Sequence, residues 1–326
     1  MRYAATRLVQ LILVLLVVSF LAFLMVRVLP GDPVLAMTGC PEDALDVPEC
    51  AEKVSAAREG LRLDEPLFSA YFAWLSDLLP PDVDLGTSFV RNEQVSDALA
   101  PAIPRTALLM AYSIGLGLVL AVPLGVLAAY KAGGWTDRVI STSSFGVIAL
   151  PNFILAVLLV YVFAIELGWF PATAGQEADL SNGLVNHIKG YTLPVLSLGL
   201  GLAAVFTRLL RTDMVATLSE DYIGMAKAKG MPVRRILFSH ALRPSSFTLL
   251  TVVGLNIGQL IGGAVIIEFI FGINGVGTQM VGAVQRSDYT LLQAGIVLIA
   301  FAFITINLVV DLLYGVLDPR VRHARS

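Results

Sequence analysis

The chain has 326 residues, of which 56% are hydrophobic and 14% are charged, and its formal net charge is −3 at pH 7. Soluble globular domains carry about 45–50% apolar and about 25% charged residues, so this composition excludes an ordinary soluble protein and indicates an integral membrane protein. Nothing in the charge balance favours a nucleic-acid partner.

Long apolar runs predict transmembrane helices. A helix needs roughly 20 apolar residues to cross a hydrocarbon core of about 30 Å, and only helices or closed barrels satisfy their backbone groups in lipid. Because the runs are continuous rather than alternating, we predict an all-α polytopic membrane protein with six transmembrane helices. The predicted spans are Leu8–Val28, Ala107–Tyr130, Val139–Leu167, Leu193–Leu210, Leu249–Ile267 and Leu291–Val316.

The first run also has some features of a cleaved signal peptide. Its apolar part, Leu8 to Val26, is longer than is typical of such peptides, and the following Arg27-Val28-Leu29-Pro30-Gly31-Asp32 is a poor small-residue cleavage site. We therefore expect residues 1–30 to form a retained first transmembrane helix.

Basic residues predict the orientation, because Lys and Arg near span ends favour the cytoplasmic side. They occur before the first span, between the second and third, between the fourth and fifth, and in the tail. An even number of spans places all four segments on one side, so both termini are predicted to be cytoplasmic. These basic residues are Arg2, Arg7, Lys131, Arg138, Arg208, Arg211, Lys227, Lys229, Arg234, Arg235, Arg243, Arg320, Arg322 and Arg325.

The segment after the first span is acidic and falls on the opposite side. Between Gly31 and Ala100 there are fourteen Asp or Glu against four Lys or Arg. The segment is too long for a simple loop, so we predict that residues 31–102 form a small extracytoplasmic subdomain with short helices. Apolar residues from Leu67 to Leu78 recur at helical spacing and predict a helix that lies on the membrane surface or on the bundle.

Both cysteines, Cys40 and Cys50, lie in this acidic segment. Thiols on the oxidising side of a membrane commonly pair, so a disulfide is expected. A metal site is the alternative, but no His and no further Cys lies nearby.

Catalytic motifs are missing. The sequence has no Gly-x-x-x-x-Gly-Lys-Ser/Thr phosphate loop and no nucleophile placed beside a His base. His187, His240 and His323 fall in or beside connections, where solvated side chains are expected. We therefore predict that the chain is not an enzyme and binds no cofactor or metal.

The span centres carry mainly uncharged polar groups rather than the charges that mark proton or ion pathways. This argues against a proton- or sodium-coupled carrier, although it leaves a channel open. Pro123 and Pro151 interrupt two spans, where such residues make kinks or close contacts between helices. The candidate residues for lining a translocation path are Ser197, Asn256, Gln259 and Asn307.

A basic segment between the fourth and fifth spans is rich in small residues. Tyr222, Met225, Ala226 and Lys229 share one helical face, and Gly230-Met231-Pro232 is typical of a helix end. A second short helix is expected to follow from Val233 to Leu242. The alternative is a basic loop resting on anionic lipid headgroups.

This segment resembles the cytoplasmic coupling motif of ABC importer permeases, in its peptide-permease form. The similarity to the B-type subunit of oligopeptide and dipeptide permeases extends in order over almost the whole chain. The family's general motif begins Glu-Ala-Ala where this chain has Gly224-Met225-Ala226, and the family usually has Pro where this chain has Asn274. The matching stretches are Arg27-Val28-Leu29-Pro30-Gly31-Asp32-Pro33, Asp84-Leu85-Gly86-x-Ser88, Pro104-Arg105-Thr106, Leu150-Pro151-x-Phe153, Gly168-Trp169-x-Pro171, Asp221-Tyr222-Ile223-x-x-Ala226-x-Ala228-Lys229-Gly230 and Arg286-x-Asp288-Tyr289.

The resemblance implies a type I ABC importer permease bundle in a bacterial plasma (inner) membrane, with a core domain at residues 103–326. It implies a homologous second permease subunit, two ATPases that hold ATP and Mg, and an extracytoplasmic binding protein that delivers oligopeptides or dipeptides. Import of nickel, glutathione or another small solute by the same architecture remains the alternative. A stand-alone channel, a secondary carrier or a scaffold is a more distant alternative. ATPase contact is expected in the coupling segment, residues 219–245, through Asp221, Tyr222, Met225, Ala226, Ala228, Lys229, Gly230, Arg234 and Arg235.

Overall fold

The computed structural model describes residues 2–28, 31–41, 43, 46–80, 83–175 and 179–317. This part is mainly helical, which confirms the predicted all-α class. It divides into two compact units, described separately below: unit 1 comprises Met1–Thr106 and Asn274–Leu308, and unit 2 comprises Ala107–Ile273 and Val309–Ser326. The first helix and the acidic segment thus share a unit with residues near the C-terminus.

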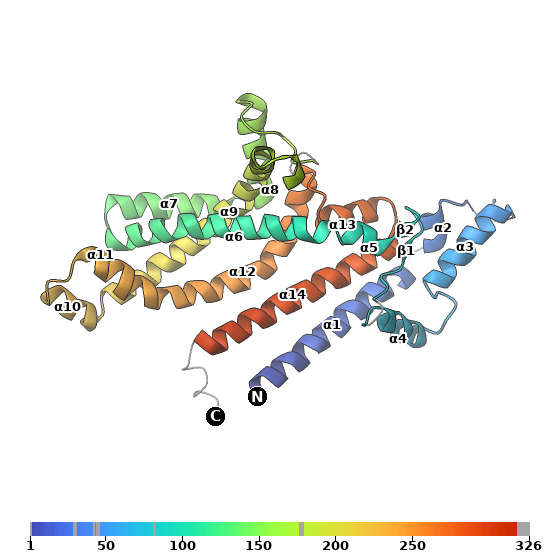
Figure 1. The fold of residues 1–326 in the computed structure, drawn as a ribbon, viewed down its shortest axis with the longest axis horizontal. Helices are drawn as coiled ribbons and strands as arrows, with labels where there is room; N and C mark the ends of the chain where they lie inside the picture. Colours follow the sequence, from blue (N-terminus) through green and yellow to red (C-terminus); the bar gives the residue numbers. More distant parts are fainter. Residues whose placement is uncertain are drawn as a thin grey trace. The chain divides into compact units, whose positions relative to one another are not determined.

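Unit 1 combines two long helices with several short elements (Figure 1). Its acidic segment contains the short helices that the sequence predicts. The elements are α1 (Arg2–Val28), α2 (Pro33–Thr38), α3 (Pro48–Gly60), α4 (Leu67–Asp77), β1 (Thr87–Ser88), β2 (Glu93–Gln94), α5 (Val95–Leu99), the start of α6 (Ala102–Tyr130), α13 (Val276–Gln285) and most of α14 (Tyr289–Leu317).

Helix α4 packs on α1 through aromatic contacts. The Tyr71 ring lies edge-on to Phe20 and Phe23, and its hydroxyl lies 2.8 Å from the Ser19 hydroxyl. The Cys40–Cys50 disulfide joins the residues after α2 to the first turn of α3, with a Cα–Cα distance of 5.8 Å. The predicted disulfide is thus confirmed, as is the helix predicted from Leu67 onward.

The β1–β2 hairpin is held by a buried carboxylate. Asp288 is fully buried, accepts a 2.5 Å hydrogen bond from the Ser88 hydroxyl, and accepts a second bond from the backbone N–H of Leu291 at the start of α14. Because a buried carboxylate is costly without donors, these bonds fix the hairpin against α14.

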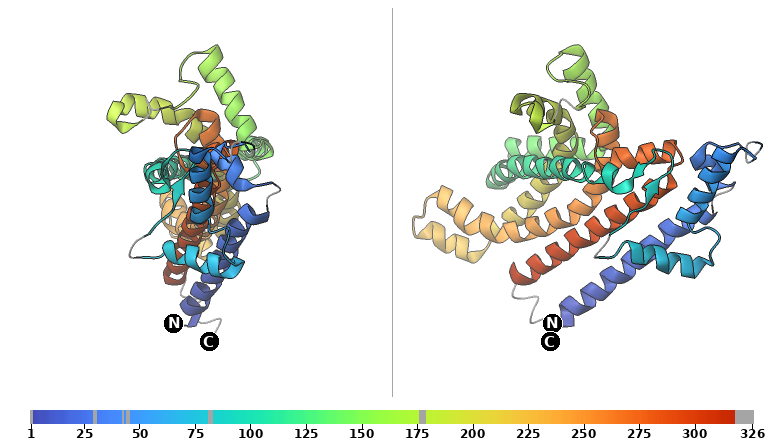
Figure 2. Two further views of the ribbon diagram at one scale, coloured as in Figure 1. Left: turned by 90° about the vertical axis from the view of Figure 1, so that its right-hand side faces the viewer. Right: turned by 45° about the vertical axis from the view of Figure 1, so that its right-hand side comes forward.

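Unit 2 contains long helices that run beside one another (Figures 1 and 2). The segments α11, the following π-helix and α12 form one nearly continuous helical stretch. The elements are the rest of α6, α7 (Trp135–Ala149), α8 (Asn152–Leu159), a π-helix (Val160–Glu166), a 3-10 turn (Leu180–Asn182), α9 (Leu184–Leu218), α10 (Asp221–Ala228), α11 (Val233–Arg235), a π-helix (Ile236–Ala241), α12 (Leu242–Phe271) and the end of α14.

The third predicted span is sharply broken. Leu150 has an extended backbone (φ −92°, ψ 123°), since the residue before a proline is driven out of the helical region, and the helices on either side meet at 100°. Figure 2 shows the segment after α7 running across the direction of α6 and α7. Pro123, by contrast, lies inside an unbroken α6.

Five helical segments of the described part are long and apolar enough to cross a membrane, and the bent pair raises the number to six. This agrees with the six spans predicted, and shows the fourth and fifth to be longer than expected. The segments are Val9–Val28, Val95–Tyr130, Leu184–Leu218, Val233–Phe271 and Tyr289–Val310, with the bent pair Trp135–Ala149 and Asn152–Glu166.

Candidate functional site

The coupling segment begins where α9 ends and forms a helix, a tight turn and a second helix (Figure 1). Gly230 has φ +74° and follows α10. Its N–H bonds the carbonyl of Lys227, and the N–H of Met231 bonds the carbonyl of Ala226. This is the Schellman arrangement, which satisfies the last carbonyls of a helix and favours glycine at the left-handed position. The structure therefore confirms that the helix ends just before Gly230, as Gly230-Met231-Pro232 predicted.

A small apolar cluster fixes α10 against the second helix. Ile223 and Ala226 of α10 pack with Ile236, and Leu218 and Met231 cover the cluster. The sequence predicted that Ala226 lies on the helical face that contacts an ATPase. In the structure its side chain is buried between α10 and Ile236. Ala226 therefore supports the helix, and its small size allows the close packing.

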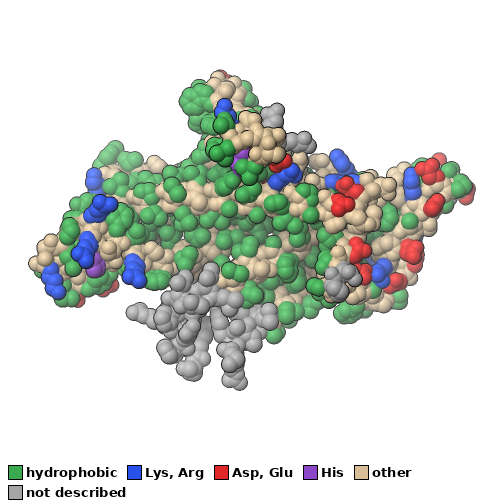
Figure 3. All heavy atoms as spheres, in the orientation of Figure 1, with side chains coloured by type: hydrophobic (Ala, Val, Ile, Leu, Met, Phe, Trp, Pro, Cys, Tyr) green, Lys and Arg blue, Asp and Glu red, His purple; other side chains and the backbone are tan. Residues whose placement is uncertain are grey.

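The opposite face of α10 is open. Met225 is 60% exposed, and Tyr222, Lys229, Arg234 and Arg235 are also exposed. Asp221, at the first position of α10, and Ala228 are exposed as well. Figure 3 shows Lys and Arg side chains gathered at the end of unit 2 that α10 and α11 form. This end presents an apolar methionine within a basic surface, with no covering residue in the described part of unit 2.

The coupling segment is tied to the long helices that flank it. The Tyr222 hydroxyl donates to the carbonyl of His240 at 3.2 Å, and the Thr217 hydroxyl of α9 lies 3.3 Å from that of Ser245 in α12. The chain then runs directly into α12. The coupling segment is therefore fixed to its neighbours by side-chain hydrogen bonds as well as by the chain itself.

Two of the predicted path residues share one cavity in unit 2. Asn256 and Gln259 line a cavity of about 180 Å³ between the α7–α8 bend, α9 and α12. Ser197 does not line it, since it is fully buried and its hydroxyl donates to the Leu193 carbonyl at 2.8 Å. Asn307 belongs to unit 1, where its amide donates to the Phe303 carbonyl.

Asn152 also lines this cavity and is absent from the predicted set. It is the first residue of α8, directly after Pro151. An amide placed at a proline break within an apolar run is the sequence signal that would have identified it.

His187 corrects another expectation. Helix α9 begins earlier than the predicted fourth span, so His187 lies inside it rather than in a solvated loop. The side chain is buried, its Nε2 lies 3.1 Å from the Tyr112 hydroxyl, and its ring is 4.7 Å from that of Tyr191. His240 is half-buried, and His323 lies outside the described residues.

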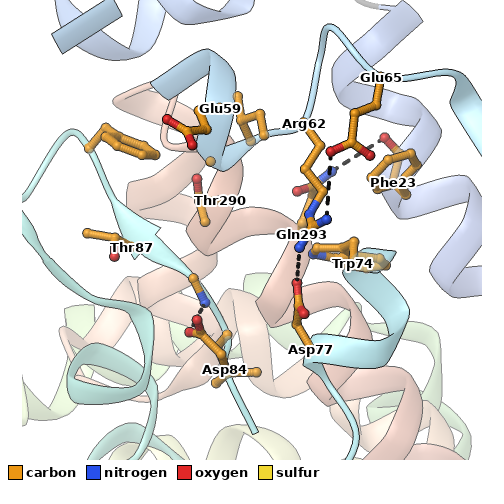
Figure 4. Close-up of a pocket in the computed structure, with 15 residues that line it drawn as sticks. Phe23, Glu59, Arg62, Glu65, Trp74, Asp77, Asp84, Thr87, Thr290 and Gln293 are labelled. Carbon is orange, nitrogen blue, oxygen red and sulfur yellow. Dashed lines mark hydrogen bonds and ion pairs between the residues drawn. The ribbon is translucent and has the colours of Figure 1, made fainter. Parts of the chain in front are cut away.

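Unit 1 has its own cavity, of about 390 Å³, at the acidic segment. Arg62 lies between Glu65 and Asp77, with its Nη2 2.9 Å from an Asp77 oxygen (Figure 4). The aromatic rings of Phe23 and Trp74 close one side. The ion pairs hold the turn after α3 to α4.

Comparison with known proteins agrees with these features. Residues 121–323 match the family described as binding-protein-dependent transport system inner membrane component, and residues 1–110 match the N-terminal part of such membrane components. The glutathione transport system permease protein GsiC of Escherichia coli O6:H1 (strain CFT073) is 36% identical over 323 residues, which cover 99% of each chain. The GsiC proteins of Escherichia coli K12 and Shigella flexneri serotype 5b are 35% identical over the same length.

Similarity over nearly the full length, multiple apolar helices and the coupling segment lead to one assignment. The chain belongs to the binding-protein-dependent transport system inner membrane components, as a multi-pass permease of an ABC importer of the peptide and nickel branch.

Proposed function

We propose that this permease forms half of the path through which an ATP-driven importer takes up short peptides, and that glutathione is the first peptide to test. The supporting observation is the identity of 35–36% over 99% of the chain to permeases named for glutathione transport. Glutathione is itself a tripeptide, so this cargo and the peptide reading from the sequence belong to one chemical class.

The energy is proposed to enter through the coupling segment. Each of two partner ATPases, which hold ATP and Mg, would receive one permease's α10, and Met225 would insert into the ATPase surface. Arg234 and Arg235 would pair with its acidic residues. The seating of Ile223 and Ala226 beneath the helix and the Tyr222 bond to the His240 carbonyl support this role, because they make the segment stiff.

Uptake in proteoliposomes tests the proposal. The permease is reconstituted with its partner permease, ATPases and binding protein, and ATP-dependent uptake is measured for glutathione, trialanine and Ni²⁺. We expect uptake of one or both peptides, with none when the ATPase carries an inactive phosphate loop.

Two results would contradict it. If the complex took up Ni²⁺ and neither peptide, it would be a nickel importer and the proposed peptide cargo would be wrong. Flux through the permease alone, without ATPases, would assign a channel or a secondary carrier instead.

A further inference from the structure

We propose that Asn152, Gln259 and Asn256 form a subsite that binds the peptide main chain during passage, and that it does so whatever the cargo's side chains are. The inference rests on the proposed function, because it assigns a peptide as the cargo. It concerns the cavity of about 180 Å³ in unit 2.

The bend beside this cavity needs a polar environment. Pro151 has no N–H, and Leu150 is extended, so carbonyls at the end of α7 lose their usual partners in the next turn. In lipid each unsatisfied backbone group costs several kcal/mol, so non-helical backbone at membrane depth lies inside protein or beside a water-filled cavity. The bend and the cavity are adjacent, which favours the second case.

The amides at the cavity have unused hydrogen-bonding capacity. Within the described residues, the side chains of Asn152 and Gln259 have no hydrogen-bond partner, whereas Asn256 uses one N–H on the Val252 carbonyl at 2.8 Å. A side-chain amide offers both donors and an acceptor. Asn152 and Gln259 are exposed and Asn256 is half-buried, so all three amides are accessible to water or to a ligand in the cavity.

Two glycines place the Asn152 amide. A Cβ at Gly201 of α9 would lie 3.0 Å from Asn152 Oδ1, and one at Gly263 of α12 would lie 3.6 Å from Nδ2. Gly201 therefore leaves the space that the amide oxygen needs. A methyl group there would require the Asn152 amide to move by a few tenths of an ångström.

The chemistry of the lining selects the ligand class. A peptide bond presents one donor and one acceptor, which matches these amides, and the cavity is lined by amides, apolar side chains and Gly201, with no charged side chain among its lining residues. The volume is below the roughly 300–1,000 Å³ of pockets that enclose a whole small ligand. The subsite thus contacts one segment of the main chain and leaves the side chains outside.

Thiol labelling tests whether the cavity is aqueous. The sequence has two cysteines, and both are in the disulfide, so an introduced cysteine is the sole free thiol of this chain, and labelling is read on this subunit alone. In the assembled complex, Asn152→Cys and Gln259→Cys should react with a water-soluble maleimide, and saturating trialanine, which has no thiol, should slow the reaction. The matched control, Val253→Cys on α12, is buried and should not react. Absence of labelling at both test positions would overturn the proposal.

Transport rates test main-chain recognition. Asn152→Leu and Gln259→Leu should each lower the uptake rate roughly two- to tenfold, the effect of losing one net hydrogen bond. The loss should be equal for Ala-Ala-Ala, Ala-Lys-Ala and Ala-Glu-Ala at saturating binding protein. Asn186→Ala is the control, since the Asn186 amide in α9 donates to the Asn182 carbonyl in the preceding 3-10 turn, and it should leave uptake unchanged.

The outcomes separate the two proposals. Wild-type complex that imports no peptide refutes the proposed cargo. If the wild-type complex imports peptide and both leucine variants import it at the same rate, the subsite alone is refuted. A loss confined to one of the three peptides would show recognition of side chains and would also overturn the subsite.

Discussion

Arg211 of α9 binds Asp137 of α7 through two hydrogen bonds, and the distance between Arg211 Nη2 and Asp137 Oδ2 is 2.6 Å. The carboxylate side chain is only 5% exposed and also accepts from the Gly133 N–H and the Ser141 hydroxyl. The pair therefore joins two helices of unit 2 through a nearly buried charge. The sequence predicted Arg211 only as a basic residue near the end of a span, where its side chain could reach the membrane surface.

Asp137→Ala should destabilise the permease, because it leaves Arg211 without its partner. Removing one member of a buried pair costs roughly 3–5 kcal/mol, and we expect the lower end because Arg211 is 30% exposed. The measurement is the apparent melting temperature of the purified complex in detergent. Glu220→Gln, at an exposed position, is the control. Equal melting temperatures for the two variants would show that the pair is dispensable.

Gly230→Ala should impair coupling, although it adds only one methyl group. The left-handed conformation at φ +74° costs an L-residue about 1–2 kcal/mol, so the turn after α10 would shift. The measurement is the ATPase rate stimulated by loaded binding protein, which should fall while complex assembly persists.

Gly224→Ala provides the matched control for that variant. Gly224 lies within α10, and an added Cβ there meets nothing within 4 Å. Alanine favours a helix by about 1 kcal/mol over glycine, so this variant should couple normally. If the two alanine variants behaved alike, the conformation at Gly230 would not matter for coupling.

Ile223→Ala and Met225→Ala should fail in different ways. Ile223 is fully buried in the cluster under α10, and its truncation should cost roughly 2–5 kcal/mol and loosen the coupling segment, seen as faster proteolysis there. Met225 is exposed, so its truncation should leave proteolysis unchanged and weaken ATPase binding, measured by co-purification. Full ATPase retention by Met225→Ala would argue against its proposed contact.

Reduction of the Cys40–Cys50 disulfide should destabilise the segment around α2 and α3. A crosslink that closes a loop of about ten residues contributes roughly 2–3 kcal/mol in the chain-entropy model. Cys40→Ser/Cys50→Ser should therefore be cleaved faster by protease added to spheroplasts. The unreduced wild type should show no free thiol, and a reactive thiol there would contradict the pairing.

Much of the architecture followed from local sequence properties. The length of the apolar runs predicted the number of spans, and Gly230-Met231-Pro232 predicted the end of α10, because both depend on neighbouring residues alone. The position of both cysteines in the acidic segment predicted their pairing, and the order of short motifs indicated the permease family.

Other features were decided only by tertiary structure, since they depend on residues far apart in the chain. Ala226 could be assigned to a helical face, but only the packing of Ile236 against it buried that face. Pro151 predicted a kink, but its size of 100° and the meeting of Asn152 with Gly201 and Gly263 required the placement of three helices. The burial of His187 depends on Tyr112 from another helix. Local sequence thus determined the elements and the membrane class, whereas packing between helices decided which side chains remain available for function.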